Sequence, residues 1–145
     1  MADRKANFET TKGNFTVQLF ESQAPITTAN FIELASKGFY DGLTFHRYVQ
    51  NFVVQGGDPS GNGTGGSGKN IKLEIVPELR HDTAGVMAMA RSGHPDSASC
   101  QFYFTLQATP HLDGGYAVFG KVIDGLDNTL ALREGDKMTK VTITE

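Results

Sequence analysis

Short runs of strand-forming residues, separated by turn residues, recur along the whole chain of 145 residues. A first pair, at residues 7–11 and 15–20, surrounds a glycine turn, as expected of a hairpin. Further runs cover residues 43–49, 52–55, 71–76, 86–90, 102–106, 117–122 and 138–144. Helical patterns occur only at residues 24–38, with Pro25 in the first turn and Gly38 at the end, and at residues 126–133. Because no strand–helix–strand rhythm repeats, we expect a mainly antiparallel, closed sheet with two helices.

The composition limits the class of protein. Hydrophobic residues make up 39% and charged residues 20%, and no apolar run is long enough to span a membrane. The length, and the lack of a linker or repeat, predict one domain over residues 1–145. The net charge of −3 comes without a basic patch, which argues against nucleic acid as a partner. The first seven residues lack a secretory-signal pattern and Cys100 is the only cysteine, so we expect a cytoplasmic protein.

Two glycine motifs suggest phosphate binding but lack the required context. Residues 61–66 fit G-x-G-x-x-G, and residues 63–69 fit G-x-x-x-x-G-K. Both motifs need a helix to start directly after the loop, whereas the residues that follow alternate like a strand, and Asn70 replaces the Ser or Thr that would bind magnesium. The four histidines have no metal-ligand spacing, and Cys100 is typical of a small buried residue. We therefore expect no nucleotide, metal or other cofactor.

The segment of residues 44–58 contains an arginine between two apolar runs. Arg47 either faces solvent or pairs with a carboxylate, or it is a buried residue kept for function. The turn former Asn51 places a connection near residues 50–52. A three-residue connection would set Gln55 opposite Arg47 on one face, whereas a two-residue connection would set Gln55 opposite His46. The strand register therefore tests whether Arg47 and Gln55 share a site.

Several segments together resemble the cyclophilins. The pattern F-H-R-x-x-x-x-F-x-x-Q-G-G-D at residues 45–58 is similar to the signature of that family. Residues 62–66 resemble its glycine loop, residues 87–91 its central strand, residues 99–104 its S-x-Q-F-F-I stretch, and residues 112–122 its L-D-G-x-x-x-V-F-G-x-V stretch. The resemblance is ordered and runs from about residue 8 to residue 143. It implies a closed eight-stranded antiparallel β-barrel capped by two α-helices, with peptidyl-prolyl cis/trans isomerase activity on X-Pro bonds of flexible or unfolded segments, assisting folding.

The same resemblance implies the role of each site residue. Arg47 would be the catalytic residue, and Gln55 would hold the peptide backbone. Ala90 and Arg91 would offer backbone groups to the residues before the proline, with Gln101 supporting the floor. The proline pocket would be formed by Phe52, Val53, Tyr103 and Leu112, with His111 and Tyr116 beside it.

Three pocket positions depart from the commonest family pattern. His111 stands where many members have Trp, Tyr116 where many have His, and Tyr103 where Phe is usual. Because the family's Trp is associated with tight cyclosporin binding, we expect weak cyclosporin binding. The hydroxyl of Tyr103 needs a partner that the sequence does not identify.

Two other classes of function stay open at this point. A non-catalytic module could hold proline-containing segments in the same groove, since Arg47, Phe52 and Gln55 would be present in either case. A structural subunit of an assembly is the third possibility, although no sequence feature favours it over the expected monomer.

Overall fold

Nine β-strands pair into one curled, antiparallel sheet in the computed structural model, which describes residues 3–144. Residues 1, 2 and 145, which the predicted domain of residues 1–145 includes, lie outside the described residues. The strands are β1 (Lys5–Thr10), β2 (Gly13–Leu19), β3 (Leu43–Thr44), β4 (Arg47–Val49), β5 (Val53–Gly56), β6 (Val86–Met89), β7 (Phe102–Thr105), β8 (Val118–Asp124) and β9 (Lys137–Thr144). Their order across the sheet is β3-β9-β1-β2-β8-β6-β7-β5-β4.

The two edge strands of the sheet, β3 and β4, follow one another directly in the chain. The strands β3 and β4 are separated only by Phe45 and His46, yet β3 pairs with β9 and β4 pairs with β5. Phe45 is fully buried, and its backbone bonds to Asp136 and Gly135 rather than to a neighbouring strand. The run predicted at residues 43–49 is therefore split in two, and the run at residues 71–76 forms no strand, so the sheet has nine strands where the resemblance implied eight. The mainly β, antiparallel, two-helix class is confirmed.

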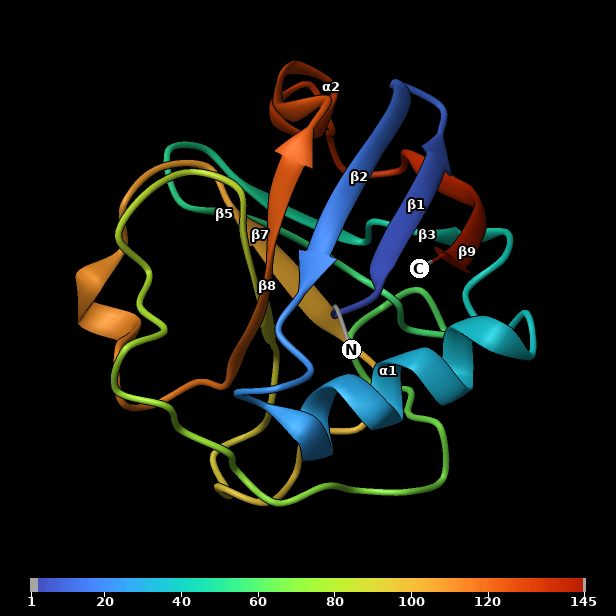
Figure 1. Cartoon of the computed structure of the whole chain (residues 1–145). Helices are drawn as coiled ribbons and strands as arrows, with labels where there is room; N and C mark the ends of the chain where they lie inside the picture. Colours follow the sequence, from blue (N-terminus) through green and yellow to red (C-terminus); the bar gives the residue numbers. More distant parts are fainter. Residues whose placement is uncertain (1–2, 145) are drawn as a thin grey trace.

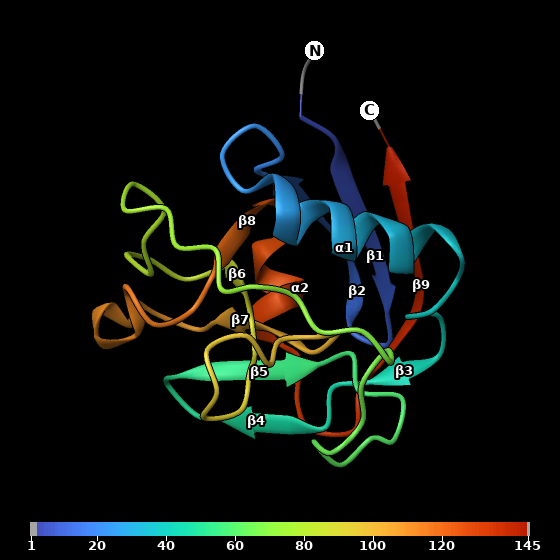
Figure 2. The same ribbon diagram turned by 90° about the horizontal axis from the view of Figure 1, so that it is seen from below.

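Two helices lie toward opposite ends of the curled sheet. The helix α1 (Pro25–Ser36) crosses one end and α2 (Leu126–Leu130) lies at the other (Figure 1, Figure 2). Gly38 follows α1 with φ of +77°, as a glycine cap requires. The helix α2 ends earlier than the predicted residue 133, because the chain turns there toward β9 and the Arg133 N–H donates to Asp136. Among residues 3–144, no helix is long and apolar enough to cross a membrane.

The predicted strand at residues 71–76 is wrong. Ile71 alone forms an isolated bridge, with Ala98, and the rest of the segment is irregular. The alternation of polar and apolar residues in this segment does not reflect strand pairing. Its polar groups bond instead to distant side chains and backbone. The Leu73 N–H donates to the Asp96 carboxylate, and the Glu74 carboxylate accepts from the first turn of α1.

Aromatic rings fill the inside of the sheet. Phe8 stacks on Phe15 with ring centroids 4.9 Å apart, and it meets Phe102 and Phe104 edge to face. Side chains alternate between the faces of a strand, so Tyr103, between the latter two, points to the opposite face of β7. There it packs with Val53, Val86, Ala88 and Val118 in a second apolar cluster. This outer cluster forms the base of the candidate site.

Candidate active site

A single row of residues runs across four neighbouring strand pairs on the outer face of the sheet. Arg47 pairs with Gln55, Gln55 with Tyr103, Tyr103 with Ala88, and Ala88 with Val118. Residues 50–52 connect β4 to β5, and Asn51 has φ of +61°. The three-residue connection and the shared face of Arg47 and Gln55 are thereby confirmed.

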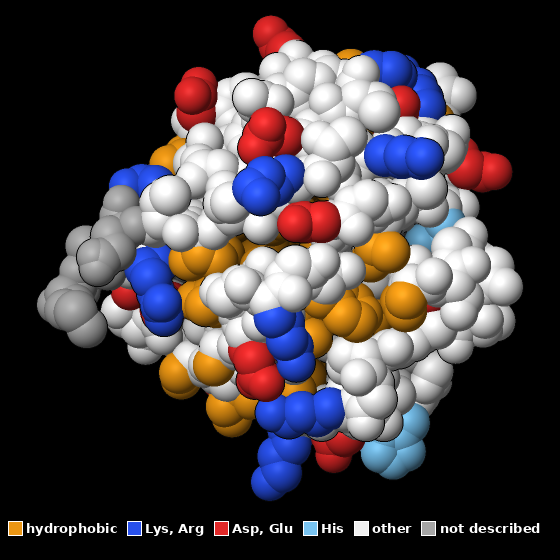
Figure 3. Space-filling view, turned by 90° about the vertical axis from the view of Figure 1, so that its right-hand side faces the viewer, with side chains coloured by type: hydrophobic (Ala, Val, Ile, Leu, Met, Phe, Trp, Pro, Cys, Tyr) orange, Lys and Arg blue, Asp and Glu red, His pale blue; other side chains and the backbone are white. Residues whose placement is uncertain are grey.

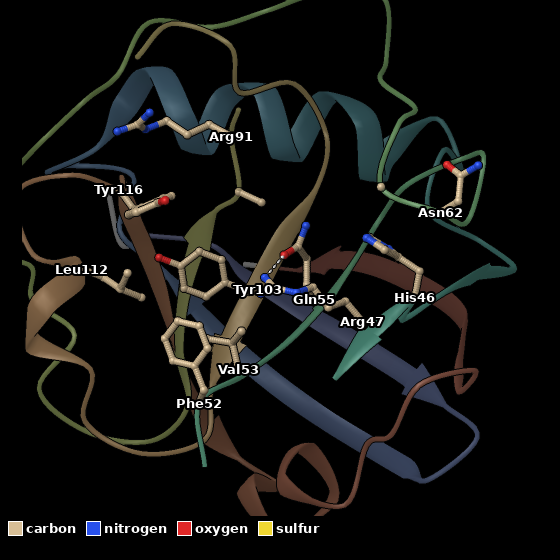
Figure 4. Close-up of a pocket in the computed structure, with 12 residues that line it drawn as sticks. His46, Arg47, Phe52, Val53, Gln55, Asn62, Arg91, Tyr103, Leu112 and Tyr116 are labelled. Carbon is tan, nitrogen blue, oxygen red and sulfur yellow. Dashed lines mark hydrogen bonds between the residues drawn. The ribbon is translucent and has the colours of Figure 1, made fainter. Parts of the chain in front are cut away.

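A groove of about 470 Å³ lies over this row (Figure 4). Its lining comprises His46, Arg47, Phe52, Val53, Gln55, Asn62, Gly63, Ala90, Arg91, Tyr103, Leu112 and Tyr116. Of the predicted site residues, only Gln101 and His111 are outside this lining. A second hollow of about 330 Å³ adjoins it and shares Gln55, Gly63, Ala90 and Arg91 with it. Gln101 lines this second hollow.

One side of the groove is polar and connected by hydrogen bonds. Arg47 Nη1 donates to Gln55 Oε1 at 3.3 Å (Figure 4). Gln55 Nε2 donates to Gln101 Oε1 at 2.9 Å. Gln101 Nε2 in turn donates to the carbonyls of Gly63 and Gly65 at 3.1 and 3.0 Å. The two glutamines thus join the arginine to the glycine loop.

Of the alternatives that the sequence left open for Arg47, the structure supports the solvent-facing one. Its side chain is exposed at the rim of the groove, and the partner recorded for it is a neutral amide rather than a carboxylate. Solvent satisfies the rest of the guanidinium, which removes the desolvation cost that a buried arginine would carry. A ligand in the groove would cover this guanidinium.

The other side of the groove is apolar and aromatic. Phe52, Val53, Tyr103 and Leu112 lie around one end of it (Figure 4). His111 lies outside this end, with its exposed ring stacked on Phe52 at 5.5 Å between centroids. The four residues therefore form an apolar hollow with a guanidinium at its opposite rim.

Ala90 and Arg91 follow β6 at the upper edge of the groove. The Ala90 N–H donates to the Gln101 carbonyl, so a backbone contact from Ala90 to a peptide would have to use its carbonyl. Arg91 Nε donates to the Gly115 carbonyl at 2.9 Å, and its guanidinium lies 4.9 Å from the centre of the Tyr116 ring. The side chain of Arg91 thus supports Tyr116 in the groove wall.

Three lining residues, His46, Asn62 and Gly63, are absent from the predicted set. Strict alternation along one strand turns His46 away from Arg47, but the chain breaks its strand at this point. Burial lowers the pKa of His46, and its buried Nδ1 has no hydrogen-bond partner within residues 3–144. Asn62 and Gly63 belong to the glycine loop. The resemblance of this loop to that of the family was the sequence feature that could have placed both residues at the groove.

The glycine loop is folded around a carboxylate of the chain itself. Asp58 is 1% exposed and accepts from the backbone N–H groups of Ser60, Asn62 and Gly63. Burial raises the pKa of this carboxyl, but the three donors outweigh burial and leave it below its usual range. Backbone donors that could cradle a phosphate already bind Asp58, and no helix begins between residues 70 and 85, as predicted.

The chain offers little for metal or thiol chemistry in the part that the structure describes. Residues 3–144 contain no group of three or more His, Cys, Asp or Glu side chains placed to hold a metal ion. Cys100 is buried, and burial raises its pKa to about 11, so it is mostly protonated near neutrality.

Comparison with known proteins gives the same family throughout. Residues 5–145 match the family described as cyclophilin type peptidyl-prolyl cis-trans isomerase/CLD. Peptidyl-prolyl cis-trans isomerase-like 1 of Neurospora crassa is 47% identical over 121 residues, which cover 81% of this chain and 74% of that protein.

Solved structures agree with the sequence matches. A cyclophilin type peptidyl-prolyl cis-trans isomerase of Cryptosporidium parvum superimposes with a TM-score of 0.92 at 32% identity, over 98% of both chains. The same protein, crystallised in the presence of the dipeptide Ala-Pro, superimposes with a TM-score of 0.91 at 31% identity, over 97% of this chain and 99% of that one. The chain belongs to the cyclophilin-type peptidyl-prolyl cis-trans isomerase family.

Proposed function

We propose that the groove binds proline-containing segments and that Arg47 accelerates rotation about their X-Pro bonds. The observation that carries the proposal is the row Arg47, Gln55 and Tyr103, which sets a directed cation at one rim of an apolar hollow. The Ala-Pro dipeptide named for the Cryptosporidium parvum structure supports this choice of ligand.

The reaction needs no nucleophile. Resonance between the amide nitrogen and the carbonyl opposes rotation with a barrier of about 18–20 kcal/mol. For X-Pro the two planar isomers differ by only about 0.5–1 kcal/mol, so both are substrates. A catalyst therefore has to stabilise the twisted state more than either planar state.

Arg47 suits this task because of its charge and shape. In the twisted amide the nitrogen lone pair is localised, and a guanidinium N–H directed toward it is a better donor there than to a planar amide. Gln55 would orient the guanidinium through the contact at 3.3 Å, and its amide would also face the peptide backbone. Phe52, Val53, Tyr103 and Leu112 would hold the proline ring and exclude water beside the arginine.

The test compares the wild type with Arg47→Ala and Arg47→Lys on a short proline peptide. We expect Arg47→Ala to lower kcat/KM by at least about tenfold without loss of fold, since one preorganised donor is removed. Arg47→Lys should recover only part of the rate, because a lysine lacks the planar fork.

The matched control is Lys121→Ala, which removes a positive charge from an exposed position on β8 outside the groove. Line-shape NMR detects binding and exchange separately. Full activity in Arg47→Ala removes Arg47 from the mechanism, and a wild type that binds without accelerating exchange is a binding module instead.

We propose weak cyclosporin binding as a second property of the groove. His111 is exposed and stacked on Phe52, in the place where the resemblance puts the Trp of other members. An imidazole offers less apolar area than an indole, so His111→Trp should tighten binding. Isothermal titration on both proteins checks this, and nanomolar affinity of the wild type contradicts it.

The cellular setting is proposed on sequence grounds. We propose a cytoplasmic monomer that assists the folding of unfolded segments. Light scattering tests the oligomeric state, and refolding of a proline-limited substrate protein, with Arg47→Ala as control, tests the assistance.

A further inference from the structure

A completely buried histidine lies directly behind the apolar end of the groove. His81 is 0% exposed and does not line the groove. A buried imidazole is costly unless both ring nitrogens have partners. The proposed mechanism gives His81 no part, so its contacts require a separate explanation.

Both ring nitrogens of His81 have a partner. Nδ1 lies 2.8 Å from Asp113 Oδ1, and Nε2 lies 2.8 Å from the Tyr103 hydroxyl. A carboxylate only accepts, so the ring carries a hydrogen on Nδ1, which leaves Nε2 to accept from the hydroxyl. Burial raises the pKa of Tyr103 well above its usual value, so this hydroxyl keeps its proton and can donate. His81 is the partner that the Tyr103 hydroxyl requires.

The backbone of His81 is fastened to the segment that carries Leu112. The His81 N–H donates to Asp113 Oδ1 at 2.6 Å, and the Thr109 N–H donates to the His81 carbonyl at 2.9 Å. These two contacts bracket the 3₁₀ helix η1 (Pro110–Leu112). One residue thus links the groove floor on β7 to the wall on η1.

We infer that His81 is a positioning residue, which sets the spacing between Tyr103 and Leu112 and thereby the fit of the groove to a proline ring. The inference rests on the proposed function, because it concerns the pocket in which that ring would bind. The pocket holds the ring in the planar and twisted states alike, so His81 acts mainly on KM. Its contribution is separate from that of Arg47, which acts on kcat.

Two amide variants separate the two ring contacts. In His81→Asn the amide lies where Nδ1 was, so it keeps the Asp113 contact and loses Tyr103. In His81→Gln the amide reaches the place of Nε2, so it keeps Tyr103. We expect KM to rise about three- to tenfold in His81→Asn, as one lost hydrogen bond implies, with kcat within about twofold. His81→Gln should lie closer to the wild type.

A double-mutant cycle distinguishes positioning from general destabilisation. In a Tyr103→Phe background the hydroxyl is gone, so His81→Asn should raise KM no further. Thr129→Ala controls for stability, because Thr129 is fully buried on α2, away from the groove. Assays run at a temperature at which every variant is folded by circular dichroism. An equal KM rise in both backgrounds overturns the inference, as does a similar rise in Thr129→Ala.

A spectroscopic measurement tests the contact without activity. Nitrogen-15 NMR of the imidazole should find a hydrogen on Nδ1 and none on Nε2, and Tyr103→Phe should shift only the Nε2 signal strongly. A hydrogen on Nε2 overturns the assigned contact.

If the wild type lacks isomerase activity, the proposed function fails. If Arg47→Ala is impaired while His81→Asn has an unchanged KM, only the role of His81 fails.

Discussion

Asp58 and Arg47 show how differently two charged residues of one motif are accommodated. Arg47 stays exposed at the groove rim, where water solvates most of its guanidinium. Asp58 is nearly inaccessible, and three backbone N–H groups replace its water. The carboxylate therefore determines the path of the glycine loop that brings Asn62 and Gly63 to the groove.

Asp58→Asn should loosen this loop. An amide supplies one accepting oxygen and sets an NH₂ group against backbone donors, so we expect a loss of about 1–3 kcal/mol in unfolding free energy. Hydrogen exchange should become faster at the amides of Asn62 and Gly63. Asp82→Asn, at an exposed position, is the control. Unchanged exchange at both amides would contradict this role of Asp58.

At the scale of elements, α1 depends on a carboxylate far away in the chain. Its N-cap residue, Ala24, provides no side-chain hydrogen bond. Glu74 accepts instead from the N–H groups of Ile26 at 3.1 Å and Thr27 at 2.8 Å. A negative charge at this end also suits the helix dipole. The irregular segment that contains Glu74 is thus fastened to α1.

Glu74→Ala should lower the unfolding free energy by about 1 kcal/mol, as the loss of a helix cap does. Glu78→Ala, an equal loss of charge at an exposed position four residues later, should change it little. Urea unfolding of both variants provides the comparison. Equal unfolding free energies for Glu74→Ala and Glu78→Ala would show that the Glu74 contact contributes nothing to stability.

At the scale of the whole molecule, charges of both signs are mixed over the surface. Figure 3 shows positive and negative side chains interspersed on one face, with apolar side chains between them. Exposed pairs of this kind contribute little to stability and are screened by salt. The carboxylates whose pKa is lowered are a better guide to the response to acid.

Stability should fall as the solution is acidified. Burial raises the pKa of Asp58, Asp113 and Asp136, but hydrogen-bond donors and nearby positive charges together outweigh it and leave the pKa of each carboxyl below its usual range. Because the folded pKa is the lower one, their contribution is complete above the unfolded value of about 4 and is lost as the pH falls through the folded values. Burial lowers the pKa of His46, so this residue adds a loss of stability that begins as the pH falls below its usual pKa of about 6.5.

Urea midpoints between pH 7 and pH 2.5 measure this loss. In Asp58→Asn the urea midpoint should fall less steeply as the pH is lowered. The difference in midpoint between this variant and the wild type should therefore narrow toward low pH. A difference that is constant over this range would exclude a titrating Asp58 contribution.

Local features of the chain were predictable because nearby residues determine them. The hairpin of β1 and β2 follows from alternation around Gly13, and the ends of α1 lie within two residues of their predicted positions because Pro25 and Gly38 mark them. The pairing of Arg47 with Gln55 also depends on a short connection, with Asn51 in a left-handed conformation. The remaining predicted site residues came from the family resemblance rather than from local patterns.

Only the tertiary structure decided the contacts between distant segments. Alternation along a strand does not reveal that Gln55 pairs with Tyr103, that Glu74 caps α1, or that the strand breaks at Phe45. The partner of the Tyr103 hydroxyl was likewise invisible, because His81 meets it through the fold and not through a motif. The sequence by itself determined most of the strands, the turn at Asn51 and the presence of Arg47 on β4. The pairing of the strands in the curled sheet decided which of these side chains share one groove, because that pairing joins strands that are remote in the chain.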